Sequence, residues 1–160
     1  MTIQETTPAE MWMAALIDAT SDTSNIFLEL GDLHVTRRSG CMPEFTNAGF
    51  VSLVGDCSSI QVGICASNDA CREMAAKFLD MDGDDPQLTR EEIVDAFGEL
   101  ANIVAGAVKQ QVSEQGEMML LGLPLVVAGK PQLSDGQHVV SAECMMGHIP
   151  LALLIITNTE

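Results

Sequence analysis

The sequence predicts an α+β domain in which a largely antiparallel sheet carries two long helices packed on one face. Runs rich in Val, Ile and Leu at residues 50–66 and 118–157 are typical of strands, and two long helical stretches at residues 8–28 and 89–115 lie outside them. A chain of 160 residues is one domain by length, and its 47% hydrophobic residues can fill a substantial core. We therefore expect a single domain over residues 1–160.

The first half of the chain is expected to begin with a helix and to continue into strands and a shorter helix. Pro8 suits the first turn of a helix over residues 8–28, because a backbone N–H is not needed there. A short helix through Leu79 follows the strands, with Ser67 or Asn68 as its N-cap. Short apolar runs predict the intervening strands at residues 33–37, 50–54 and 60–66, the last two joined as a hairpin.

The second half begins with the longest expected helix. Thr89 with Glu92 three residues later forms a capping box, in which the side chains satisfy free backbone N–H groups. The helix runs to about Gln115, and Gly116 ends it. Strands are expected at residues 118–128, 139–146 and 149–157, with Gly147–His148 as the tight turn between the last two.

A polar ridge along the longest helix is the most informative pattern in the chain. Asp95, Glu99, Asn102 and Gly106 follow one another at steps of four, three and four. On an α-helix these steps place all four within roughly 60° of one another. Asn and Gly are poor helix formers, so something other than helix stability favours them here. The apolar side of the same helix lies about 160° away and comprises Ile93, Phe97, Leu100, Val104, Ala107 and Val108.

The pattern Asp-xxx-Glu-xx-Asn-xxx-Gly, within the stretch GELANIVAGAVK, closely resembles the active helix of the CheC/CheX family of chemotaxis phosphatases. The resemblance is nearest to the CheX type, which is a single module with one such helix. It extends over roughly residues 10–157, which follow the same order of helices and strands. Outside the motif helix the match is one of pattern rather than of identical residues. The resemblance implies a CheC/CheX-like α+β fold.

The chemistry of the ridge is compatible with what this resemblance implies. Neither Glu nor Asn is a good nucleophile, but a carboxylate can hold a partner's lysine and a carboxamide can orient a water. Phosphoryl transfer depends mainly on such positioning. By resemblance, the substrate is the aspartyl phosphate of a CheY-type response regulator, which brings its own Mg²⁺ and lysine, so this chain needs no cofactor of its own. Glu99 would hold that lysine and Asn102 the attacking water, while Gly106 and Asp95 would contact the partner.

Two other interpretations of the ridge remain open at the level of sequence. It can be an ordinary solvated helix face, or it can be the docking surface of a non-catalytic adaptor like those in flagellar switches. The resemblance also implies a homodimer paired through sheet edges, and the apolar run from Ile149 to Ile156 is a candidate edge. The sequence does not identify the target regulator, or whether its pathway is chemotaxis or another two-component circuit.

The first helix contains a partial repeat of the motif. Asp18, Asp22 and Asn25 have the same four-then-three spacing, and CheC proteins carry two such sites. These residues therefore form a possible degenerate second site. The acid is Asp rather than Glu, no matching glycine follows, and several Ser and Thr residues nearby make a chance match easy.

Metal binding is not predicted. Acids recur between Asp80 and Glu91 at most of the calcium-loop positions, but Asp85 stands where that loop needs glycine. The three histidines are far apart in the sequence and have no acid or cysteine at ligand spacing. The acidic stretch is instead interpreted as a polar turn before the long helix.

Charge and composition restrict the partners further. A net charge of −16 with only 7 Lys and Arg argues against nucleic acid and against an anionic membrane surface. The first ten residues lack the features of a signal peptide, and the longest apolar run, Leu151 to Ile156, is too short to span a bilayer. Five scattered cysteines without a C-x-x-C pair are typical of reduced thiols. We expect a cytoplasmic protein.

Overall fold

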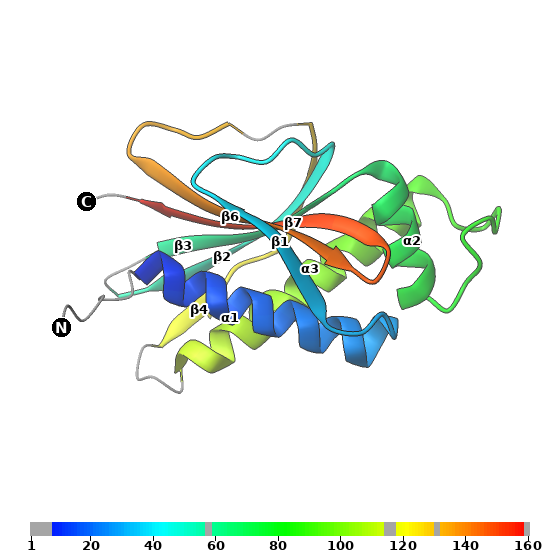
Figure 1. Ribbon diagram of the computed structural model, residues 1–160, viewed down its shortest axis with the longest axis horizontal. Helices are drawn as coiled ribbons and strands as arrows, with labels where there is room; N and C mark the ends of the chain where they lie inside the picture. The colour runs from blue at the N-terminus through cyan, green and yellow to red at the C-terminus, as the bar shows by residue number, and fades with distance from the viewer. Residues whose placement is uncertain (1–7, 57–58, 114–117, 130–131, 159–160) are drawn as a thin grey trace.

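The computed structural model describes residues 8–56, 59–113, 118–129 and 132–158, which form an antiparallel sheet covered by helices (Figure 1). The helical elements are α1 (Pro8–Thr23), the π-helical turn η1 (Ser24–Leu28), α2 (Asn68–Phe78) and α3 (Arg90–Ser113). The strands are β1 (Leu33–Ser39), β2 (Asn47–Gly55), β3 (Ser59–Ala66), β4 (Met119–Leu121), β5 (Leu125–Ala128), β6 (Gln137–Met146) and β7 (Ile149–Asn158). Every strand pairing in these ranges is antiparallel.

The strand order places β7 at the centre of the sheet. The order is β1-β6-β7-β3-β2-β4, and β5 pairs with the other end of β2. The prediction that Ile149 to Ile156 forms an exposed edge is therefore wrong. Residues 151–156 are all buried because both faces of β7 are covered, and a continuous apolar run is typical of a strand in that position.

The two long helices pack on one face of the sheet, as the sequence predicts. In Figure 1 α1 and α3 lie below the sheet and cross in this view, α1 running from left to right and α3 from right to left, and the two helices pack against each other. α1 packs over β6 and β7, and α3 packs over β2, β4 and β5. The core between these layers includes Met13, Leu16, Phe97, Leu100, Leu151, Leu153 and Ile155. The opposite face carries Leu154 and Ile156, which pack with Met42 and Phe45 from the connection between β1 and β2.

The sequence predictions for the starts of α2 and α3 and for the turn between β6 and β7 are confirmed. Ser67 is the N-cap of α2, since its Oγ accepts a hydrogen bond from the backbone N–H of Ala70 at 3.1 Å. The Thr89 hydroxyl accepts from the backbone N–H of Glu92 at 3.2 Å, which is half of the expected capping box. Gly147 has φ +62° in the turn between β6 and β7. The expected helix end at Gly116 lies outside the described residues.

The strand expected at residues 118–128 is divided into two short strands. β4 pairs with the last residues of β2 and β5 with the first residues. Between them Gly122 donates its N–H to the Ser52 carbonyl at 2.8 Å, and a Cβ on Gly122 would lie 3.2 Å from that oxygen. This close approach and the following Pro124 interrupt the ladder.

The first helix is not α-helical over the whole of residues 8–28. It changes at Thr23 into the π-turn η1, which ends at Glu29 in the left-handed conformation. The hydroxyls of Thr20 and Thr23 donate to the carbonyls of Leu16 and Ala19, at 2.7 and 2.8 Å. Such side-chain bonds to the preceding turn often distort helices. None of the helices in the described ranges is long and apolar enough to cross a membrane.

Candidate active site

Helix α3 separates an apolar side from a polar side as its sequence predicts. Its buried residues are Ala96, Phe97, Gly98, Leu100, Ala101, Val104, Ala105, Val108 and Val112. Ile93 and Ala107, also expected on the apolar side, are partly buried and pack against the same core. The apolar side faces the sheet and fixes the rotation of the helix, so the polar ridge is directed away from the core.

The ridge residues share one surface of α3. Asp95 and Glu99 are exposed, while Asn102, Gly106 and Lys109 are partly exposed. Glu99 and Asn102 are one turn apart, which is a rise of about 4.5 Å along the axis. Within the part of the chain that the structure describes, neither side chain makes a hydrogen bond or ion pair. The carboxylate and the carboxamide are therefore free to bind groups of another molecule.

The packing of the described residues does not require glycine at position 106. A Cβ built on this residue meets no atom within 4 Å, so the fold leaves room for alanine. Gly98 on the same helix differs, because its Cβ would contact Cγ2 of Val126 in β5 at 3.4 Å. Glycine in a helix costs about 0.5–1 kcal/mol relative to alanine. At Gly106 no contact with the described residues compensates for this cost.

The possible second site on α1 is not assembled in the same way. Asp18 and Asp22 are exposed on α1, but Asn25 lies in the π-turn, where the spacing of an α-helix no longer applies. Its Nδ2 donates to Oδ1 of Asp32 at 2.7 Å. The amide of Asn25 is therefore engaged within the chain, unlike that of Asn102.

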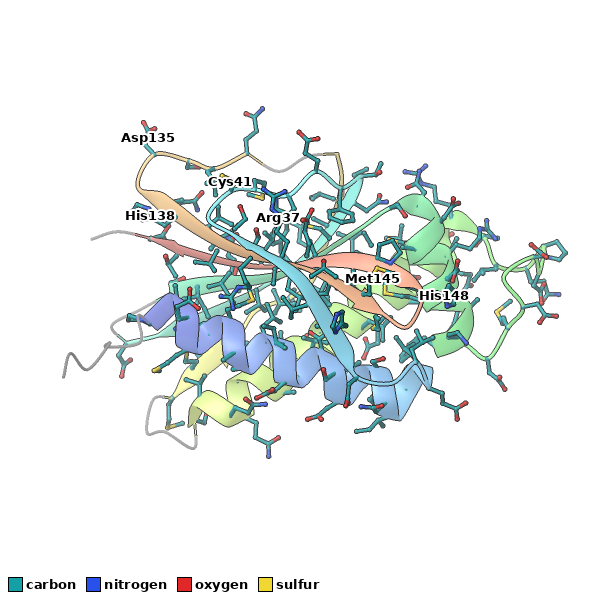
Figure 2. The ribbon with its side chains drawn as sticks, viewed as in Figure 1. Arg37, Cys41, Asp135, His138, Met145 and His148 are labelled. Atoms are coloured by element: carbon teal, nitrogen blue, oxygen red, sulfur yellow. The ribbon has the colours of Figure 1, made fainter. Side chains whose placement is uncertain are left out.

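The cysteines in the described residues offer no exposed, activated nucleophile near the ridge. Burial raises the pKa of Cys71 and Cys144 to about 12, and burial with the neighbouring Cys71 raises that of Cys65 to about 12. Such thiols stay protonated and unreactive at neutral pH. Cys41 is exposed but lies between β1 and β2 (Figure 2).

His138 and His148 are also separated in space. Figure 2 shows His138 and His148 at opposite ends of the β6–β7 hairpin. The His148 ring contacts the Glu73 carboxylate of α2, which joins the turn of this hairpin to that helix. In the described ranges no three His, Cys, Asp or Glu side chains gather as a metal site would require.

Sequence reasoning missed the apolar residues of the π-turn. Ile26 is 72% exposed and Phe27 is 43% exposed, although both follow an amphipathic helix that should bury Phe27. The signal available in the sequence is the run of Thr and Ser residues before them, which weakens the α-helix without specifying what replaces it.

The chain is similar to a known protein family and to several solved structures. The family model described as "Chemotaxis phosphatase CheX" matches residues 47–145, which include the whole ridge. A search of curated protein sequences found no significant match.

Several solved structures share the fold over nearly the whole chain. A CheX–CheY–BeF₃–Mg²⁺ complex from Borrelia burgdorferi matches with a TM-score of 0.76 at 16% identity, covering 93% of this chain and 98% of that one. A CheC-like superfamily protein from Shewanella sp. PV-4 matches at 0.75 and 20% identity, covering 94% and 98%. The chemotaxis protein CheX from Vibrio vulnificus matches at 0.73 and 19% identity, covering 91% and 97%. At these identities the matches show a shared fold.

Proposed function

The chain belongs to the CheX family of chemotaxis phosphatases, and from this premise we propose that it hydrolyses the aspartyl phosphate of a CheY-type response regulator. One observation supports this most directly: an exposed acid and a partly exposed amide lie one turn apart on α3, and neither is engaged by the described residues of its own molecule. The Borrelia burgdorferi relative was solved together with CheY, BeF₃ and Mg²⁺. The same class of partner suits this chain, because a carboxylate and a carboxamide can grip and orient groups but are poor nucleophiles, and a phosphorylated regulator brings the reactive phosphoryl group itself.

In the proposed reaction each ridge residue has one task. The carboxylate of Glu99 pairs with the lysine of the regulator and holds the two proteins in register. The carboxamide of Asn102 donates to and accepts from one water and places it in line with the phosphorus. The water oxygen bonds to phosphorus as the bond to the aspartyl oxygen breaks, which releases inorganic phosphate and the free aspartate. The regulator's own Mg²⁺ balances the charge on the phosphoryl oxygens.

The proposal also covers the edge of the contact with the regulator and the compartment in which the protein acts. Gly106 lets the regulator approach the helix backbone, and Asp95 contributes at the edge of the contact. The protein acts where receiver domains are phosphorylated, which is the cytoplasm. A docking adaptor without catalysis is the alternative that the experiment must separate from this function.

The decisive experiment measures the lifetime of phosphorylated receiver domains with the pure protein at substoichiometric amounts. Each receiver of the host is phosphorylated with a small-molecule donor, the donor is removed, and phosphate release is followed with and without the protein. We expect multiple turnovers on at least one receiver and none with Asn102→Ala. Binding to a receiver without a shorter phosphate lifetime would contradict the enzyme and favour the adaptor.

A further inference from the structure

A cavity of about 240 Å³ lies where the first turns of α2 and α3 meet the start of β2 and the middle of β5. α2 packs against α3 on this side of the molecule (Figure 1). The cavity is lined by Asn47, Asn68, Asp69, Cys71, Arg72, Arg90, Ile93, Val94, Phe97 and Val126. The four ridge residues are not among them. A concave, mainly apolar site with a few convergent polar groups is the usual form of a small-molecule pocket.

The apolar part of the cavity is formed by side chains that the core holds in place. Phe97 is 1% exposed and Cys71 is 4% exposed. Ile93 and Val126 are partly buried and pack against the main core. Burial raises the pKa of the Cys71 thiol to about 12, so this part of the lining carries no charge at neutral pH. It is therefore a preformed apolar wall that suits the hydrocarbon part of a ligand.

The polar part of the cavity contains two of the seven Lys and Arg residues of the chain. Arg72 donates from Nη1 to the carbonyl of Gly83 at 3.0 Å, which uses one of the five N–H donors of its guanidinium group. Within the ranges that the structure describes, the Arg90 side chain makes no hydrogen bond or ion pair, and Arg72 makes no ion pair. In a chain with a net charge of −16, two guanidinium groups without a carboxylate partner at one cavity favour an anionic ligand.

The starts of two helices add to the positive potential of the cavity. Arg90 is the first residue of α3, where a cation is unfavourable for the helix dipole, so helix stability does not explain its presence. Asn68 and Asp69 begin α2 and also line the cavity. The N-cap Ser67 satisfies only the N–H of Ala70, and the first N–H groups of a helix have no intrahelical acceptor. These groups suit an anion in the same way as the guanidinium groups do.

The size and charge of the cavity restrict the anion that it takes. Its volume is below the range of about 300–1,000 Å³ that is typical of sites for drug-sized ligands and cofactors, so the ligand is small. Asp69 also lines the cavity, and its carboxylate balances one of the two arginine charges. One net positive charge suits a monoanion better than a polyphosphate. The apolar wall requires that this monoanion also has a hydrocarbon part.

We propose that the cavity is a binding site for a small organic carboxylate, whose charged group contacts Arg72 and Arg90 and whose hydrocarbon part contacts Phe97 and Val126. Val94 of the lining precedes Asp95 of the ridge, and the two lie about 100° apart around α3. The cavity and the ridge are therefore different sides of one helix. The inference goes beyond the proposed function and does not depend on hydrolysis of a receiver phosphate.

Three small molecules separate the two parts of the site. Benzoate has a carboxylate and a ring, acetate has the carboxylate alone, and benzamide is the uncharged analogue of benzoate. Each is titrated into the isotope-labelled protein at neutral pH, and the backbone amide signals are followed by NMR. We expect benzoate to bind with a dissociation constant of about 1 mM, which is typical of a ligand with so few atoms. The shifted signals should belong to the first turns of α2 and α3. Acetate and benzamide should bind about tenfold more weakly or less tightly still.

Arg90→Gln tests the role of the guanidinium group, and Arg37→Gln is its matched control. Arg90→Gln should weaken benzoate binding about tenfold and leave benzamide binding unchanged. Arg37 lies on β1, at the opposite end of the sheet from β2, and its side chain is 71% exposed (Figure 2). Both variants lose one positive charge, but Arg37→Gln should keep the wild-type affinity for benzoate. Unfolding curves for both variants show that the fold is retained.

Three results would overturn the carboxylate site. The first is the absence of benzoate shifts in the first turns of α2 and α3 up to about 10 mM. The second is equal affinity for benzamide and benzoate, because the site would then not recognise charge. The third is equal weakening by Arg37→Gln and Arg90→Gln, because the overall charge of the protein would then explain the effect. None of these measurements uses a receiver, so failure of the proposed function would leave their outcome unchanged.

Discussion

At Gly106 the requirements of the fold and of the proposed contact oppose each other. A Cβ there meets no atom of the described residues within 4 Å, and alanine is the better helix former. We expect Gly106→Ala to raise the free energy of unfolding by about 0.5–1 kcal/mol and to raise the half-saturating receiver concentration. Urea denaturation and phosphate-release kinetics measure the two effects.

Gly98→Ala is the matched control for that substitution. It makes the same chemical change on the buried side of α3, next to Val126. It should leave receiver kinetics unchanged, whatever its effect on stability. If Gly106→Ala gains stability and keeps wild-type kinetics, close approach of a partner at this residue is ruled out.

Removing the side chain of Asn102 and removing that of Glu99 should change different kinetic constants. Asn102→Ala should lower turnover at saturating receiver by about 100-fold or more, the usual cost of losing one preorganised polar group in a transition state. Glu99→Ala should mainly raise the half-saturating concentration, because its role is an intermolecular ion pair. Asp95→Ala should be milder than either. Near wild-type turnover for Asn102→Ala would refute water positioning by this residue.

The buried thiols make the fold sensitive to alkali. Burial raises the pKa of Cys65, Cys71 and Cys144 to about 12, whereas thiols of the unfolded chain titrate at ordinary values near 9. Between these values the unfolded state loses protons that the folded state keeps, so stability falls as pH rises. Each thiol contributes up to about 1.4 kcal/mol per pH unit.

Denaturant unfolding at pH 8, 9 and 10 measures this loss. The chain contains no tyrosine, so no phenol titrates in the same range. Cys71→Ala should flatten the pH dependence, since one of the three groups is gone. An unchanged slope in that variant would show that Cys71 is not the source of the alkaline sensitivity.

At the level of elements, the correct predictions are those that depend on neighbouring residues. The cap at Ser67 and the capping box at Thr89 join residues three apart, so the sequence alone is enough to predict them. The ridge on α3 follows from helical spacing in the same way. The position of β7 could not be predicted locally, because strand order depends on residues far apart in the chain.

The π-turn at the end of α1 could not be predicted for the same reason. Whether residues 24–28 form an α-turn or a π-turn is decided by which side chain fits the core beneath them, and Leu28 fits there. The sequence predicted a continuous helix, which would have placed Asn25 on the same face of α1 as Asp18 and Asp22. Exposure of Ile26 and Phe27 is a consequence of that packing.

The capping box at the start of α3 supports the element that carries the ridge. Thr89→Ala removes the acceptor for the N–H of Glu92 and should lower the free energy of unfolding by about 1 kcal/mol. Ser67→Ala makes the equivalent change at the N-cap of α2 and should have a similar cost. Urea denaturation of both variants checks this prediction. A stability loss only in Ser67→Ala would mean that the Thr89 cap contributes nothing.

For the whole molecule, the two edges of the sheet differ in how they resist association. β1 has an irregularity between Val35 and Arg37, and Arg37 and Arg38 form ion pairs with Glu143 and Glu10. Bulges and charges of this kind protect an edge. The β4–β5 edge is short and is interrupted at Gly122 and Pro124, but it exposes the apolar side chains of Leu120, Leu123 and Leu125 to solvent.

We therefore expect a homodimer that pairs through the β4–β5 edge. Leu120 is 75% exposed, so Leu120→Lys should convert the dimer to monomers without loss of fold. The charge of −16 on each chain opposes association at low ionic strength, so the dimer should strengthen with added salt. Light scattering at low and moderate salt measures both effects. A wild-type monomer in both conditions would exclude the dimer.

The π-turn between Thr23 and Leu30 has a consequence for how this protein can diverge. Its hydrogen bonds span five residues instead of the four of the helix that it interrupts, so a single in-frame codon deletion would restore the regular helix. That event would return an aromatic residue to the interior and withdraw the neighbouring isoleucine from the surface, with Glu99 and Asn102 untouched. Relatives that differ by one residue in this segment would then keep the ridge and present a different surface at the end of α1.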